Sequence, residues 1–222
     1  MTTAISAEQT SPCDRRRAAH DRRFVGWLFT TTALASMSGL FALAHWQYWR
    51  RTGDPKGASF ALEELVVVAM AVARRRPNDV SYRVSDWAFA LLGSLAVLLL
   101  RPGGHAVYGL TGLCVAIQLA GAVAAIVCLT RLGRSFGMVA ANRGVQNAGP
   151  YRVVRHPLYA SYFVAMTGYL LAAPTWWNVG VCVVAVGAQL RRITAEESVL
   201  ARNEDYRTYM SAVRWRLVPG VF

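Results

Sequence analysis

The chain has 222 residues, of which 55% are hydrophobic and only 16% are charged, and its mean hydropathy is +0.30. These values exclude an ordinary soluble domain and predict an integral membrane protein. The net charge of +12 does not indicate nucleic-acid binding, because the basic residues lie in clusters between apolar segments rather than along one face. We therefore expect no nucleic-acid partner.

The first 23 residues are polar and rich in arginine, and we interpret them as a disordered tail. Phe24 to Trp46 is long enough to cross the hydrocarbon layer and predicts the first transmembrane helix. The alternative is a cleaved signal peptide, since Ala42 to Ala44 resembles a cleavage site. The length of the run and the further apolar segments favour a retained helix.

Further apolar segments predict an all-α fold with five to six transmembrane helices. They span residues 58–73, 87–100, 106–129, 157–173 and 176–190. The segment 58–73 carries Glu63 and Glu64, so it is either tilted or only partly inserted. The last two segments form a helical hairpin that reverses at Pro174, and Ile193 to Val213 has the spacing of an interfacial helix.

The positions of the basic residues predict the topology. Most of the 24 Lys and Arg residues fall in the tail, the second and fourth loops and the C-terminal stretch, which places these on the cytoplasmic side. Lys56 is the only lysine, a bias common in GC-rich bacteria, so we expect a bacterial inner membrane. The predicted domains are a tail (1–23), N-terminal transmembrane helices (24–130) and a catalytic region (131–222).

The stretch from Gly149 to Ser161 combines polar side chains with a predicted helix start. Pro157 disfavours a helical conformation for His156 and suits the first position of a helix, so we expect a helix to begin there. Its free amide groups, helped by Arg155, would attract a carboxylate or phosphate. The alternative is that these arginines and tyrosines are membrane anchors.

Glu196 and Glu197 form the second polar pair. On a helix they point about 100° apart, so one could bind a cation while the other supports it. The alternative is an ion pair between Arg192 and Glu196, worth only a few tenths of a kcal/mol at a surface.

Together these residues resemble the isoprenylcysteine carboxyl methyltransferase family. The motifs are Gly149-Pro-Tyr-Arg with Arg155-His-Pro-x-Tyr159, Arg192-Ile-x-x-Glu-Glu197 with Leu200, Tyr206-x-x-Tyr209 and Arg216-x-x-Pro219. The C-terminal motifs are also similar to those of phospholipid N-methyltransferases. The resemblance covers residues 131–222.

The resemblance implies a methyltransferase that uses S-adenosylmethionine and needs no metal. It assigns the cofactor to Tyr151, Arg155, His156, Pro157, Tyr159, Glu196 and Glu197, and catalytic roles to His156, Glu197 and Arg134. A lipophilic small molecule or lipid, with a carboxylate as the most favoured acceptor group, is expected to take the methyl group by direct in-line transfer in a pocket of low water content. Arg134, Arg214 and Arg216 are candidates to orient a carboxylate, whereas an amine or hydroxyl would need a general base.

Two other classes of function compete with this interpretation. A membrane reductase of the sterol reductase type would bind NADPH, but Glu196 and Glu197 are unsuited to a nucleotide phosphate. A non-enzymatic membrane adaptor would bind neither cofactor. The sequence does not assign the oligomeric state.

Overall fold

The described residues of the computed structural model are 12–53, 55–76, 79–81, 83–101, 110–137, 141–142 and 145–222. They form seven α-helices, three short 3₁₀-helices and one two-residue strand pair, so the predicted all-α class is confirmed. In β1 (Asp79–Val80) and β2 (Ala141–Asn142), Asp79 pairs with Asn142 and Val80 with Ala141 in antiparallel register.

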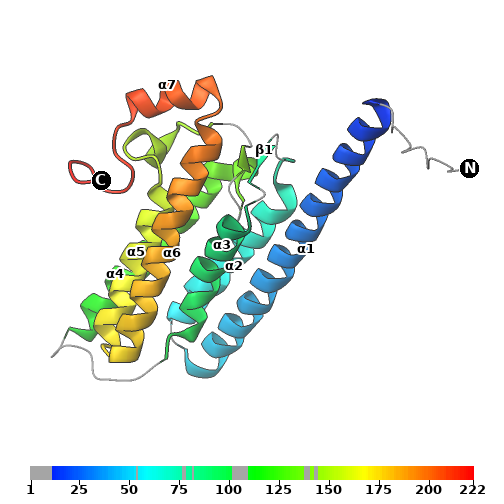
Figure 1. Ribbon diagram of the computed structural model, residues 1–222. Helices are drawn as coiled ribbons and strands as arrows, with labels where there is room; N and C mark the ends of the chain where they lie inside the picture. The colour runs from blue at the N-terminus through cyan, green and yellow to red at the C-terminus, as the bar shows by residue number, and fades with distance from the viewer. Residues whose placement is uncertain are drawn as a thin grey trace, which may run out of the picture.

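The first three α-helices come from the N-terminal half of the chain. They are α1 (Pro12–Thr52), α2 (Pro55–Ala73) and α3 (Val84–Leu95), and α3 is extended by the 3₁₀-helix η1 (Ala96–Leu99). In Figure 1, α1 lies at one edge of the bundle with α2 and α3 between it and the later helices.

The sequence predicted a disordered tail over residues 1–23, but residues 12–23 are helical in the structure. Residues 1–11 of this tail lie outside the described residues. A helix propagates outward because each added residue gains one hydrogen bond.

The second half of the chain builds the opposite side of the bundle. It contains α4 (Thr111–Leu132), η2 (Gly133–Ser135), η3 (Gly149–Arg152), α5 (Pro157–Ala172) and α6 (Trp176–Leu200). The short helix α7 (Glu204–Ala212) lies across the end of α6 (Figure 1).

The predicted interfacial helix from Ile193 to Val213 is wrong in its bounds. Helix α6 continues to Leu200, the chain turns at residues 201–203, and α7 starts afresh. The side chain of Asn203 caps α7 by accepting a hydrogen bond from the Asp205 amide at 2.8 Å. Apolar periodicity alone did not reveal this break.

The helices α4 and α5 approach each other closely through two glycines. A side chain at Gly121 would lie 2.5 Å from the backbone nitrogen of Ala165, and one at Gly168 would lie 2.5 Å from that of Gln118. Small residues that let backbones meet are typical of helix packing in membranes.

At the hairpin turn, the fully buried Asn178 donates to the carbonyl oxygens of Arg101 and Ala173, both at 2.9 Å.

Two described helices, Phe24–Thr52 and Thr111–Ser135, are long and apolar enough to cross a membrane. The count of five to six spans stays a prediction. Large apolar side chains also face outward from the bundle, for example Leu40 and Val183, which are 68% and 66% exposed. Outward apolar surface of this kind suits contact with lipid.

We predict that Gly168→Ala lowers the stability of the bundle, because the added methyl group must push α4 and α5 apart. The expected cost is about 1–3 kcal/mol. The thermal unfolding midpoint of the detergent-purified protein measures it. Gly187→Ala in α6 is the matched control, since nothing lies within 4 Å of its added carbon. Equal midpoints for the two variants would refute the close approach.

Candidate active site

The segment before α5 folds as the sequence predicts. Gly149 has φ +60°, a conformation that favours glycine, and it opens η3. His156 is the residue before the helix, with φ −126° and ψ 58°, and α5 begins at Pro157. The amide groups of Arg155 and His156 donate to the carbonyl oxygens of Trp215 and Arg216 at 2.9 and 2.8 Å. The C-terminal segment is therefore bound directly to the start of α5.

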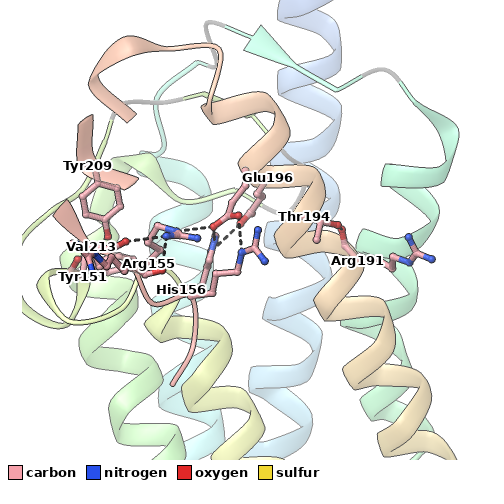
Figure 2. A network of polar contacts seen from close by, with 11 residues as sticks. Tyr151, Arg155, His156, Arg191, Thr194, Glu196, Tyr209 and Val213 are labelled. Carbon is pink, nitrogen blue, oxygen red and sulfur yellow. Dashed lines mark hydrogen bonds and ion pairs between the residues drawn. The ribbon is translucent and has the colours of Figure 1, made fainter. Parts of the chain in front are cut away.

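An ion-pair network surrounds the buried carboxylate of Glu197. Figure 2 shows two of its partners, Arg155 and His156, together with Glu196. One oxygen accepts from Arg155 Nε at 2.7 Å and lies 3.1 Å from His156 Nε2, and the other accepts from Arg216 Nε at 2.8 Å. Arg155 also donates through Nη1 to the carbonyl oxygens of Val213 and Arg214, at 2.9 and 2.8 Å. Both oxygens of Glu197 are thus occupied by protein groups.

The electrostatics of Glu197 follow from these contacts. Burial by itself would raise the pKa of the carboxyl, but the hydrogen bonds from His156 and Arg155 and the positive charge of Arg155 outweigh it. The net effect lowers the pKa from 4.5 to about 2, so the group is a carboxylate at neutral pH. Glu197 therefore holds its partners in place as a permanent anion.

Glu196 is oriented differently, as expected for neighbours on a helix. It lines a large cavity, whereas Glu197 does not. Its Oε2 lies 3.8 Å from His156 Nδ1, and its side chain is 19% exposed. Arg192 and Glu196 form no ion pair within the described residues, so the alternative drawn from spacing is not observed there.

The cavity has a volume of about 600 Å³ and lies between the two halves of the bundle. Of the predicted cofactor residues, those that line it are Tyr151, Arg155, His156, Tyr159 and Glu196. Pro157 and Glu197 lie behind this wall, and each positions residues that do line it. The walls from α1 and α2 are mostly apolar, for example Leu34, Phe41 and Phe60, although Glu63 and Glu64 of α2 also line them. One space therefore joins polar groups to apolar surface.

The structure does not bring Arg134 to this cavity. Arg134 is exposed and donates through Nε to the carbonyl oxygen of Ala73 at 3.1 Å, while its neighbours Ser135, Phe136 and Gly137 line the cavity. Arg214 and Arg216 do not line it either. The three arginines proposed from sequence to orient an acceptor are thus all placed elsewhere.

Arg192 instead supplies a cation in the cavity wall, a role that sequence reasoning missed. It is buried, stacks 5.4 Å from the ring of Tyr159 and donates to the Gly137 carbonyl at 3.2 Å. Arg192 Nε and the Tyr159 hydroxyl are buried without a hydrogen-bond partner in the described part of the chain. Buried polar groups normally find partners, so these two atoms indicate a polar ligand.

Two tyrosines of α7, Tyr206 and Tyr209, line the cavity. Tyr209 donates to the Tyr151 carbonyl oxygen at 2.6 Å, and the ring of Tyr206 packs against that of Tyr209 at an angle of 52°, with ring centres 5.6 Å apart. Burial raises the pKa of Tyr209 to about 12, so its hydroxyl keeps its proton at neutral pH and can donate the hydrogen bond to Tyr151. Their i, i+3 spacing was part of the sequence motif, but no role was assigned to them.

A comparison with known families gives a match over the part of the chain that carries this site. The model of the phospholipid methyltransferase family matches residues 106–206, which is less than half of the chain. No curated protein matches the chain. The family match supports a membrane methyltransferase and includes the polar residues from Tyr151 to Glu197. The narrower resemblance to isoprenylcysteine carboxyl methyltransferases stays a prediction.

We predict that the contribution of Glu197 to stability depends on pH. Because its pKa is lower in the folded protein, the stabilisation is fully present above pH 4.5 and is lost as the pH falls towards 2. At pH 7 the free energy of unfolding of Glu197→Gln should therefore be about 3 kcal/mol lower than that of wild type, and its thermal unfolding midpoint should be lower. The difference should shrink as the pH is lowered from 5 to about 3.

Glu204→Gln is the control, because the Glu204 side chain is 89% exposed. It should change the midpoint little at any pH. A gap between Glu197→Gln and wild type that stays constant from pH 7 to pH 3 would contradict the assignment.

Proposed function

We propose that the chain is a membrane-embedded methyltransferase that uses S-adenosylmethionine to methylate a lipophilic acceptor. The observation that carries the proposal is the single cavity that joins Glu196, His156 and Arg155 to the apolar walls of α1 and α2. A polar cofactor and an apolar acceptor can meet there away from bulk water, which favours in-line transfer. The family match gives the same class of reaction.

The residues in the wall fit this cofactor. S-adenosylmethionine, when bound, supplies an electrophilic methyl group, and it carries a carboxylate, an ammonium and a sulfonium. The carboxylate of Glu196 lies in the cavity, 3.8 Å from His156 Nδ1, and can accept further hydrogen bonds. It would hold the cationic end of S-adenosylmethionine. The buried, unpartnered hydroxyl of Tyr159 offers a further hydrogen bond.

Glu197 has a positioning role in this proposal rather than the direct cofactor contact expected from sequence. Its carboxylate orients Arg155 and His156, whose side chains line the cavity. A hydrogen bond from His156 Nε2 to Glu197 leaves Nδ1 as the ring's acceptor, on the side of Glu196. His156 can then receive a proton at that atom if the acceptor loses one.

A carboxylate remains the acceptor group that we propose first. Arg192 supports it, since a buried guanidinium with an unpartnered Nε is suited to orient an anion. A carboxylate needs no general base, because it is already a nucleophile. Arg192 takes the place of Arg134 in this role.

An amine acceptor is the second candidate, and Glu63 and Glu64 favour it. Both line the same cavity from the middle of α2, and no ion pair to either is present in the described residues. Carboxylates inside an apolar helix are costly and are usually functional. An ammonium headgroup would pair with them, and a glutamate can take the proton that an amine must lose on methylation.

We predict that the detergent-purified protein binds S-adenosylhomocysteine and not NADPH in isothermal titration. Glu196→Gln should weaken that binding about 10-fold or more, because a charge-assisted hydrogen bond is lost. Glu204→Gln, at an exposed position, should bind as wild type does. Unchanged affinity in Glu196→Gln would rule out its role in the site. Binding of NADPH alone would indicate a reductase. Binding of neither ligand would indicate a non-enzymatic adaptor.

The two acceptor classes make opposite predictions for two variants. If the acceptor is a carboxylate, Arg192→Gln should lower transfer of labelled methyl to a long-chain fatty acid by 10-fold or more, while Glu63→Gln has little effect. If it is an amine, Glu63→Gln should lower transfer to a long-chain alkylamine. Binding of S-adenosylhomocysteine by both variants is the control for an intact cofactor site.

A further inference from the structure

A second cleft, which we call the arginine cleft, lies on the other side of η2 from the large cavity. Four of its seven lining residues are arginines, namely Arg74, Arg75, Arg76 and Arg134, and none is acidic. Trp27, Val72 and Ala73 complete the wall. The cleft thus combines a strong positive charge with an apolar side.

Neutral acceptors hold the arginines of this cleft in place. Arg74 is buried and donates to Thr31 Oγ1 at 3.0 Å and Thr30 Oγ1 at 2.6 Å, which fixes the end of α2 against α1. The Arg134 carbonyl accepts from the Arg75 amide at 2.7 Å, and Arg134 Nε donates to the Ala73 carbonyl. Hydroxyl and carbonyl oxygens do not cancel charge, so the lining keeps its positive potential.

The cleft lies where a helix meets the membrane surface. Phe24 opens the candidate span Phe24–Thr52, and the Arg76 guanidinium stacks 4.6 Å from its ring and 5.5 Å from that of Trp27. Aromatic and basic side chains together are typical of the headgroup level. Val72, on the apolar side, is 63% exposed. Trp27 Nε1 is a buried donor without a partner in the described residues.

We propose that the arginine cleft binds the phosphate of an anionic phospholipid. Guanidinium groups match phosphate oxygens in charge and geometry, and the Trp27 N–H can donate to one of them. The apolar rim at Val72 suits the acyl end of a lipid, which a free phosphate ion lacks. Basic clefts beside transmembrane helices are suited to anionic headgroups.

The proposal gives Arg134 a role that does not depend on methyl transfer. Helix η2 forms part of both sites, because Arg134 lines the arginine cleft while Ser135 lines the large cavity. A lipid held by Arg134 would therefore contact the element that forms one wall of that cavity.

The test is binding of fluorescently labelled phosphatidylglycerol to the full chain in an uncharged detergent. The combined variant Arg75→Gln, Arg76→Gln and Arg134→Gln should bind about 100-fold more weakly, since each basic residue near an anionic lipid contributes about fivefold. Arg50→Gln with Arg51→Gln is the matched control. These exposed arginines lie in the last turn of α1, the helix that carries Phe24 and Trp27, and so at the end of α1 away from the cleft. This control should bind as wild type does.

Arg76→Gln alone decides the matter if the combined variant does not fold, because Arg76 is exposed and its contacts within the described residues are with the rings of Phe24 and Trp27. About fivefold weaker binding is expected. Equal binding of phosphatidylcholine, or an equal loss in the Arg50 and Arg51 control, would overturn the proposal. Complete displacement of the lipid by millimolar inorganic phosphate would assign the cleft to a free anion instead.

Discussion

The buried carboxylate of Glu197 joins three separate parts of the chain. It accepts from Arg155, just before α5, and from Arg216, in the C-terminal segment, while Glu197 itself belongs to α6. An ion pair of this kind is costly to break, because the buried guanidinium of Arg155 would be left without its anion. The orientation of His156, the start of α5 and the docking of the C-terminal segment all depend on it. Glu196 then faces the cavity because it is the neighbour of Glu197 on the same helix.

The cavity divides its chemistry between the two halves of the chain. The segment that matches the phospholipid methyltransferase family, residues 106–206, supplies the polar groups Arg155, His156 and Glu196. Helices α1 and α2 lie outside that match and supply much of the apolar wall, together with Glu63 and Glu64. If the polar groups of residues 106–206 hold the cofactor, then α1 and α2 largely select the acceptor. Acceptor identity therefore cannot follow from the family match alone.

Local chemistry in the sequence predicted the start of α5 at Pro157, the turn at Gly149 and the different orientations of the adjacent Glu196 and Glu197. Features that depend on tertiary packing could not be predicted in this way. The buried position of Arg192 follows from the packing of α6 against α3 and the residues after η2, and its motif position gave no sign of it. Arg134 was expected at the acceptor, but η2 turns its side chain towards the end of α2. Glu63 and Glu64 suggested shallow insertion of α2, whereas the structure places them in a cavity wall.

We propose that this cavity brings S-adenosylmethionine and a lipophilic acceptor together. The most direct test is transfer of a labelled methyl group from S-adenosylmethionine to a lipid extract of the native host by the purified protein. We expect label in an extractable lipophilic product with wild type, and at least about 10-fold less label with an equally well folded Glu196→Gln variant. No labelled product with wild type, or equal labelling by both proteins, would contradict it.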